Sequence, residues 1–139
     1  MKYTVPIAPM PQSRPRFTRQ GGGRAYEKPE MTAYKKAVAY HVMAQKPKKI
    51  EKGAIWIEAV FYIYPPKYVL NVKKNRELLE AETMYIDKKS DLDNYLKAFM
   101  DAVNGILYKD DGQVAYITCK KIYSLKPRTE FEIKALMEE

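Results

Sequence analysis

The sequence predicts a single compact α/β domain, and three observations support this prediction. The chain has 139 residues, which is the usual size of one domain. Residues 54–64 are rich in β-branched and aromatic side chains and place their most apolar members on one face of a strand. Residues 30–45 and 91–103 carry apolar side chains at the spacing of helices that pack along one side.

Shorter elements complete the predicted domain of residues 1–139. Further strands are expected at residues 3–7, 114–123 and 130–136. The first of these contains Pro6, which has no N–H to donate to a ladder and therefore favours an edge position. Residues 67–86 are ambiguous apart from a short polar helix expected at 75–82.

Acidic and basic residues are segregated along the chain. All six aspartates lie between Asp87 and Asp111, although the formal net charge of the protein is +8. Carboxylates that are held close together oppose folding unless a positive charge neutralises them, and a divalent cation is a common solution. Basic flanks around an acidic centre suit a protein that grips a polyanion and holds a metal against it.

Several classes of protein are excluded by composition. The single Cys119 rules out an intrachain disulfide framework and a thiolate zinc site. No stretch approaches the roughly 18 apolar residues needed to span a membrane, and the first residues do not resemble a signal peptide. We therefore expect a soluble cytoplasmic protein without a membrane partner or a small-molecule cofactor.

Residues 9–29 form an arginine-rich segment without periodicity, and they include three consecutive glycines at 21–23. This composition predicts a mobile basic loop. The guanidinium fork matches phosphate oxygens, so the loop is expected to contact nucleic acid, although a solvated linker is the alternative interpretation. The arginines that carry this expectation are Arg14, Arg16, Arg19 and Arg24.

Residues 87–113 are the most informative segment, because a helix is expected to start near Asp91 within it. Its predicted apolar stripe consists of Leu92, Leu96, Phe99 and Val103. Asp91 then lies at the N-cap and Asp93 in the first turn. A carboxylate at either position stabilises a helix by capping or through the macrodipole, so a purely structural role is the main alternative to metal binding.

Two features favour a functional role. Lys97 and Asp101 each lie one turn beyond the previous charged residue, so they share a polar side of the helix with Asp93. A second acidic pair, Asp110 and Asp111, precedes the strand expected at 114–123. That pair approaches the helix only if the strand runs antiparallel to the helix. The alternative interpretation of Asp110 and Asp111 is that they form an ordinary Asp-Gly turn with no functional role.

These motifs resemble the signature of the RusA family of Holliday-junction resolvases. The resemblance rests on Lys-Ser-Asp-Leu-Asp-Asn-Tyr-Leu-Lys at 89–97, Asp-Ala-Val-Asn-Gly at 101–105 and Asp-Asp-Gly-Gln-Val at 110–114. The segment Gln-Ser-Arg-Pro-Arg at 12–16 is similar to the basic Arg-Pro-Arg segment of that family. Ser90 and Gln12 depart from the family pattern. These departures bear on the pre-organisation of the site and on DNA binding more than on the cleavage chemistry.

The resemblance implies a mixed sheet packed by helices and a homodimer. It also implies Mg²⁺-dependent cleavage of branched DNA, in which Mn²⁺ can replace Mg²⁺, and a bacterial, phage or prophage origin. Asp91, Asp93 and Asp111 match the catalytic and metal-binding carboxylates of the family, and Lys97 matches its essential lysine. Asp110 is a further candidate ligand whose role stays open. Lys88 and Lys89, with the arginines of residues 9–29, are expected to bind DNA.

Two other functional classes remain open at this stage. The protein could be a metal-dependent nuclease that acts on flaps or single strands. It could also be a non-catalytic basic DNA-binding module, in which the aspartates cap a helix and shape a turn. The two nuclease interpretations require metal-dependent cleavage, whereas the binding module does not.

Overall fold

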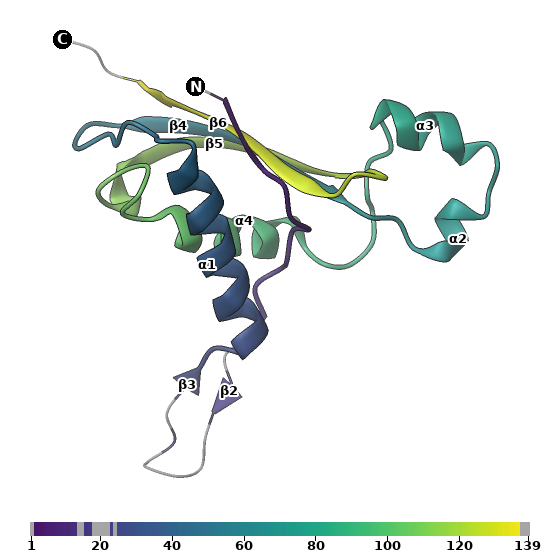
Figure 1. Ribbon diagram of the computed structural model, residues 1–139, viewed down its shortest axis with the longest axis horizontal. Helices are drawn as coiled ribbons and strands as arrows, with labels where there is room; N and C mark the ends of the chain where they lie inside the picture. The colour runs from purple at the N-terminus through teal and green to yellow at the C-terminus, as the bar shows by residue number, and fades with distance from the viewer. Residues whose placement is uncertain (1, 14–15, 18–22, 24, 137–139) are drawn as a thin grey trace.

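A mixed four-stranded sheet forms the centre of the computed structural model, which describes residues 2–13, 16–17, 23 and 25–136 (Figure 1). The strands, in spatial order, are β1 (Lys2–Val5), β6 (Arg128–Ala135), β4 (Ile55–Ile63) and β5 (Val114–Tyr123). β6 pairs antiparallel with both β1 and β4, whereas β4 and β5 pair parallel. The predicted α/β domain with a mixed sheet is therefore confirmed, and β1 is the predicted edge strand.

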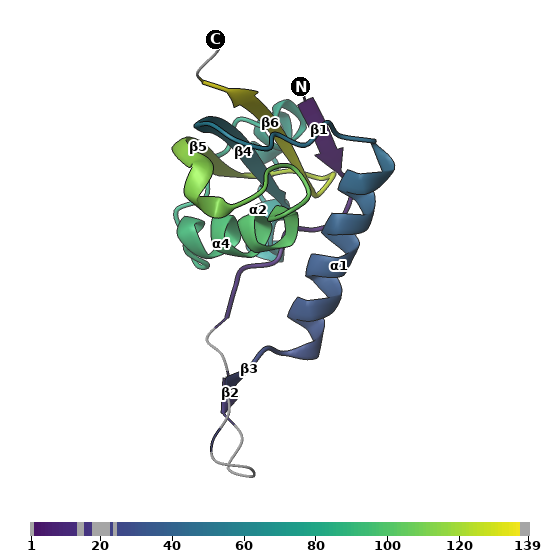
Figure 2. The ribbon, with the colours of Figure 1, turned by 90° about the vertical axis from the view of Figure 1, so that its left-hand side faces the viewer.

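One face of the sheet is covered by α1 (Pro29–Ala44) and α4 (Leu92–Val103), as Figures 1 and 2 show. The predicted alternation of β4 explains this arrangement, because its core-facing side chains are fully buried. They are Ile55, Ile57, Ala59 and Phe61. In the described part of the chain, no helix is both long enough and apolar enough to cross a membrane.

The buried side of α4 matches the predicted apolar stripe in part, because Phe99 and Val103 of that stripe are fully buried. Its buried residues are Tyr95, Ala98, Phe99, Ala102 and Val103. Leu92 and Leu96 are only partly buried at the edge of the core. Phe61 on the sheet contacts both Tyr95 and Phe99, at ring-centroid separations of 5.8 and 6.1 Å. The helix is therefore rotated towards its aromatic and alanine side, where small residues let α1 pack closely.

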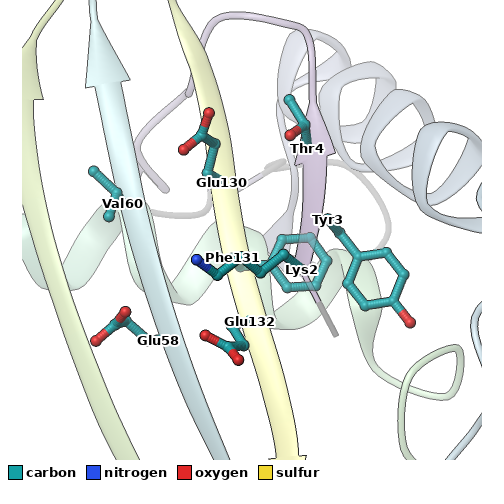
Figure 3. A pocket seen from close by; sticks show the side chains of 8 residues that line it. All are labelled: Lys2, Tyr3, Thr4, Glu58, Val60, Glu130, Phe131 and Glu132. Atoms are coloured by element: carbon teal, nitrogen blue, oxygen red, sulfur yellow. The ribbon is translucent and has the colours of Figure 1, made fainter.

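The opposite face of the sheet contains a shallow acidic hollow (Figure 3). Three glutamates from β4 and β6 lie there: Glu58, Glu130 and Glu132. In the same order, their partners are Thr118 at 3.2 Å, Arg128 at 2.8 Å and Lys134 at 3.6 Å. Each of these carboxylates has a side-chain partner on the sheet, on the face away from α4, and those of Glu130 and Glu132 are cations.

Two short helices lie between β4 and α4. Pro66 ends the preceding extended segment and is the N-cap of α2 (Lys67–Leu70), which the sequence did not predict. The predicted polar helix is α3 (Asn75–Ala81). Both helices project beyond one end of the sheet (Figure 1) and share a small separate core. That core consists of Val69, Leu79, Ile86 and Tyr123.

Residues 9–29 were predicted to form a loop without regular structure, but they contain two short strands. β2 (Arg16–Phe17) and β3 (Ala25–Tyr26) pair antiparallel, so a short hairpin extends beyond the first turn of α1 (Figure 1). Backbone pairing on either side of the glycines satisfies polar groups that a free loop would leave to solvent. Arg14, Arg19 and Arg24, which were predicted to bind DNA, lie outside the described residues.

An ion pair joins α3 to the sheet. Glu82 ends α3 in the left-handed conformation, with φ of 56°. Its two carboxylate oxygens accept hydrogen bonds from Nη1 and Nη2 of Arg128 at 2.7 and 2.9 Å. Both side chains are largely buried, and the hydrogen bond from Arg128 holds the pKa of Glu82 below its ordinary value.

We predict that Glu82→Gln lowers the free energy of unfolding by about 1–2 kcal/mol, because a half-buried guanidinium loses its bidentate partner. Glu80→Gln, which removes an exposed pair with Arg76, should cost less than about 0.5 kcal/mol. The lowered pKa makes the Glu82 contribution present above about pH 4.5 and lost as the pH falls below it. Urea unfolding of both variants at pH 7 and pH 3.5 measures this, and equal losses at pH 7 would contradict it.

Candidate functional site

Asp91 and Asp93 lie at the start of α4, where the sequence predicted them. Asp91 is the N-cap in an extended conformation, and its side chain makes no cap hydrogen bond. Asp93 lies in the first turn, and both side chains are exposed. A cap normally stabilises a helix through the hydrogen bond that Asp91 does not make. The capping alternative therefore does not account for this carboxylate.

Lys97 lies on the exposed side of α4 together with Asp93 and Asp101. Among the ion pairs of the described residues, none involves Lys97. Asp101 pairs instead with Lys35 of α1 at 3.2 Å, and Lys35 also pairs with Glu27 at 2.6 Å. Asp101 therefore has a structural partner, whereas the ammonium of Lys97 is not held in a surface pair with either aspartate.

The basic hairpin is anchored to α4 at both of its ends. On the N-terminal side, the backbone N–H of Gln12 donates to the carbonyl oxygen of Asn94 at 2.9 Å. On the C-terminal side, Lys35 joins Glu27 to Asp101, and its hydrogen bond lowers the pKa of Glu27. The arginine-rich segment thus leaves and rejoins the domain beside the helix that carries Asp91 and Asp93.

Asp110 and Asp111 have different environments. Asp110 caps the short 3₁₀ helix at 111–113, because its Oδ2 accepts a hydrogen bond from the N–H of Gly112 at 3.0 Å. The side chain of Gln113 accepts from the N–H of Asp110 in return, which completes a capping box. Asp111 is exposed, and its Oδ1 accepts from the hydroxyl of Tyr108 at 2.9 Å.

Tyr108 and Gln113 position this acidic pair, and sequence reasoning did not single them out. Tyr108 is fully buried, and burial together with the hydrogen bond to Asp111 raises its pKa, so it remains a donor at neutral pH. Gln113 donates to the carbonyl oxygens of Ile50 and Gly53, both at 3.2 Å. Gln113 lies within the 110–114 motif, but its role depends on a contact about 60 residues away in sequence.

The chain brings Asp111 to the far end of α4 rather than to its start. The hydroxyl of Tyr108 lies near Met100, which is seven residues after Asp93 and about 10 Å further along the helix axis. β5 runs antiparallel to α4, which is the condition under which Asp110 and Asp111 were predicted to approach the helix. Within the described residues, no three acidic, histidine or cysteine side chains form a group that could hold a metal.

A lysine on β5 approaches the loop in front of Asp91. Lys121 Nζ donates to the carbonyl oxygens of Lys88 and Ser90, both at 2.6 Å. Ser90 also hydrogen-bonds the hydroxyl of Tyr95, which opposes the rise in pKa that burial imposes on Tyr95. Sequence reasoning missed Lys121; the available signal was a lysine at an inward-facing position of a predicted strand.

Carboxylate oxygens without structural hydrogen bonds are suitable ligands for a hard divalent cation. Asp91 and Asp93 meet this condition, being exposed and two residues apart. Asp110 and Asp111 meet it only in part, because one oxygen of each already accepts a hydrogen bond, from Gly112 at 3.0 Å and from Tyr108 at 2.9 Å. The donors at the start of α4 therefore fit a cation such as Mg²⁺, and Asp111 as a ligand of the same ion stays a prediction.

Comparison with known proteins identifies the family. The profile of the family described as Endodeoxyribonuclease RusA matches residues 6–134, which is nearly the whole chain. The protein therefore belongs to the RusA endodeoxyribonuclease family, as the resemblance of its motifs implied. It is also 36% identical over 135 residues to the uncharacterized protein YqaN of Bacillus subtilis (strain 168), over 96% of this chain and 95% of YqaN.

We predict that Asp110→Ala lowers the free energy of unfolding by about 1 kcal/mol, because the N–H of Gly112 loses its acceptor. Asp91→Ala should change it by less than about 0.5 kcal/mol, since no cap hydrogen bond is removed. Chemical denaturation of the metal-free variants measures both values. A larger loss of unfolding free energy for Asp91→Ala than for Asp110→Ala would indicate that Asp91 has a structural role.

Proposed function

We propose that this protein is a magnesium-dependent endonuclease that resolves Holliday junctions by paired incisions in the cytoplasm of a bacterium. One observation carries the proposal: Asp91 and Asp93 lie exposed at the start of α4, and within the described residues neither side chain is held by a hydrogen bond that would explain it. Membership of the RusA endodeoxyribonuclease family supports nuclease chemistry at this position.

Asp91 and Asp93 are the proposed ligands of the cation, and Asp111 is the proposed third functional carboxylate. When bound, a divalent cation lowers the pKa of a water molecule and offsets the negative charge of a phosphate. Tyr108 orients Asp111 near Met100, on the side of α4 that also carries Asp93. Asp110 is assigned to capping rather than to metal binding.

Lysines around the carboxylates provide positive charge for DNA. Lys97, one turn beyond Asp93 on the exposed side of α4, is the proposed contact to the scissile phosphate. Lys88 and Lys89 are exposed immediately before Asp91 and are proposed to hold the backbone of the same strand. The arginines of residues 9–29 are proposed to bind DNA as well, since the backbone of Gln12 in that segment is joined to α4.

A homodimer would match the symmetry of the substrate. A four-way junction has two-fold symmetry, so a two-fold dimer presents one site to each of two opposed strands. We propose this assembly, and light scattering at several concentrations tests it. A monomer under conditions where junctions are cleaved in pairs would overturn it.

The substrate is tested by incubating the protein with labelled DNA in Mg²⁺ or in EDTA. The panel comprises a four-way junction, a 5′ flap, a single strand and a linear duplex. Symmetric incisions confined to the four-way junction are expected. Equal cleavage of the flap or the single strand would favour a broader nuclease, and binding without cleavage in every case would leave a DNA-binding module.

We predict that Asp93→Asn abolishes Mg²⁺-dependent cleavage by at least about 100-fold, because the cation loses a carboxylate oxygen. Junction binding should be retained or tightened, since less negative charge faces the phosphates. Asp87→Asn removes the same charge from an exposed aspartate outside the proposed site and serves as the matched control. Retained cleavage in the Asp93 variant would count decisively against this site.

A further inference from the structure

Asp91 depends on its backbone for its position. Its side chain makes no cap hydrogen bond, so the carboxylate is not held by the N-terminus of α4. On the C-terminal side its carbonyl oxygen accepts from the N–H of Asn94 at 3.1 Å, as the first turn of α4 requires. On the N-terminal side, the exposed loop at 87–90 carries the chain from the edge of β5 to the helix.

The ammonium of Lys121 holds this loop. It donates to the carbonyl oxygens of Lys88 and Ser90, both at 2.6 Å, so the chain bends around one cation immediately before Asp91. The strand position of Lys121 is itself fixed, because it pairs with Phe61 on β4 and its carbonyl accepts from the N–H of Ile86. A charged donor on a strand of the sheet is thus hydrogen-bonded to the loop that precedes Asp91.

We infer that Lys121 is a positioning residue of the metal site: it fixes the loop at 88–90 so that Asp91 stands beside Asp93 before the cation arrives. This inference rests on the proposed function. Ligands must be held to within about 0.5 Å for tight binding, and residues that orient them typically account for 10–100-fold in metal affinity or activity. Ser90, where the sequence departs from the family pattern, is secured by Lys121 and by its contact with Tyr95.

The test compares Lys121→Met, which keeps the apolar stem but loses the donors, with Lys120→Met. Lys120 is the neighbouring exposed lysine and pairs with Val60 on the opposite face of the sheet, so it is a matched control. We expect Lys121→Met to weaken Mn²⁺ binding by about 10-fold or more, measured by titration calorimetry without DNA. Hydrogen exchange of the amides at 88–91 in the metal-free protein should accelerate, while Lys120→Met changes neither.

Kinetics separate positioning from general destabilisation. Lys121→Met should lower kcat for junction cleavage by about 10–100-fold and leave KM for the junction within about twofold. Lys121→Arg, which restores a charged donor, should recover most of the loss. Unchanged Mn²⁺ affinity and unchanged exchange in Lys121→Met would overturn the inference, as would an equal effect of Lys120→Met.

The two proposals fail in distinguishable ways. If the native protein cleaves no DNA, the proposed function fails, whereas Mn²⁺ affinity and amide exchange still decide the role of Lys121. If Lys121→Met is too unstable to purify, Lys121→Gln keeps one donor and is expected to show an intermediate loss of Mn²⁺ affinity. Native affinity in that folded variant would also overturn the inference.

Discussion

The parallel pairing of β4 and β5 is the constraint on which the rest of the structure depends. Two parallel neighbours cannot be joined by a tight turn, so the chain must return across the sheet before β5 begins. That return contains α2, α3 and α4, and it places α4 antiparallel to β5 on the covered face. As a result the end of β5 lies at the start of α4, which brings Lys121 to the loop before Asp91.

The same constraint separates the acidic residues. Because β5 starts where α4 ends, Asp111 meets the last turn of the helix through Tyr108, whereas Asp91 and Asp93 remain at the first turn. Asp110 and Asp111 are neighbours in sequence and both are exposed, but Asp110 caps the 3₁₀ helix whereas Asp111 accepts from Tyr108. Of the aspartates in this segment, Asp101 is paired with Lys35 at 3.2 Å.

The sequence was sufficient for the elements whose patterns are local. The alternation of β4 and the helical spacing of α1 directly reflect burial against one layer, so both were predicted to within a residue or two. On α4 the burial of Phe99 and Val103 was predicted correctly, whereas the burial of Leu92 and Leu96 was overestimated because they are more hydrophobic than Tyr95 and Ala98. Aromatic contacts across the sheet, from Phe61 to Tyr95 and Phe99, decide its orientation instead.

Contacts distant in sequence explain what could not be predicted. Asp91 and Asp110 were both candidate caps, and only Asp110 is followed three residues later by a glutamine that completes a capping box; whether either side chain makes its hydrogen bond depends on the local backbone. The Lys121 contact joins residues about 30 positions apart, and the Gln113 contacts about 60. The family motif identified the candidate carboxylates, but only the fold separates those with structural partners from those without.

Titration of Mn²⁺ into the metal-free protein, followed by paramagnetic broadening of backbone amide signals, tests the central claim most directly. The start of α4 is predicted to hold the cation, so the amides around Asp91 and Asp93 should broaden first and saturably. The amide signals of Glu58 and Glu132, which are cross-strand neighbours on the opposite face of the sheet, should remain sharp. Broadening centred on those glutamates, or weak broadening spread along the chain, would contradict the account.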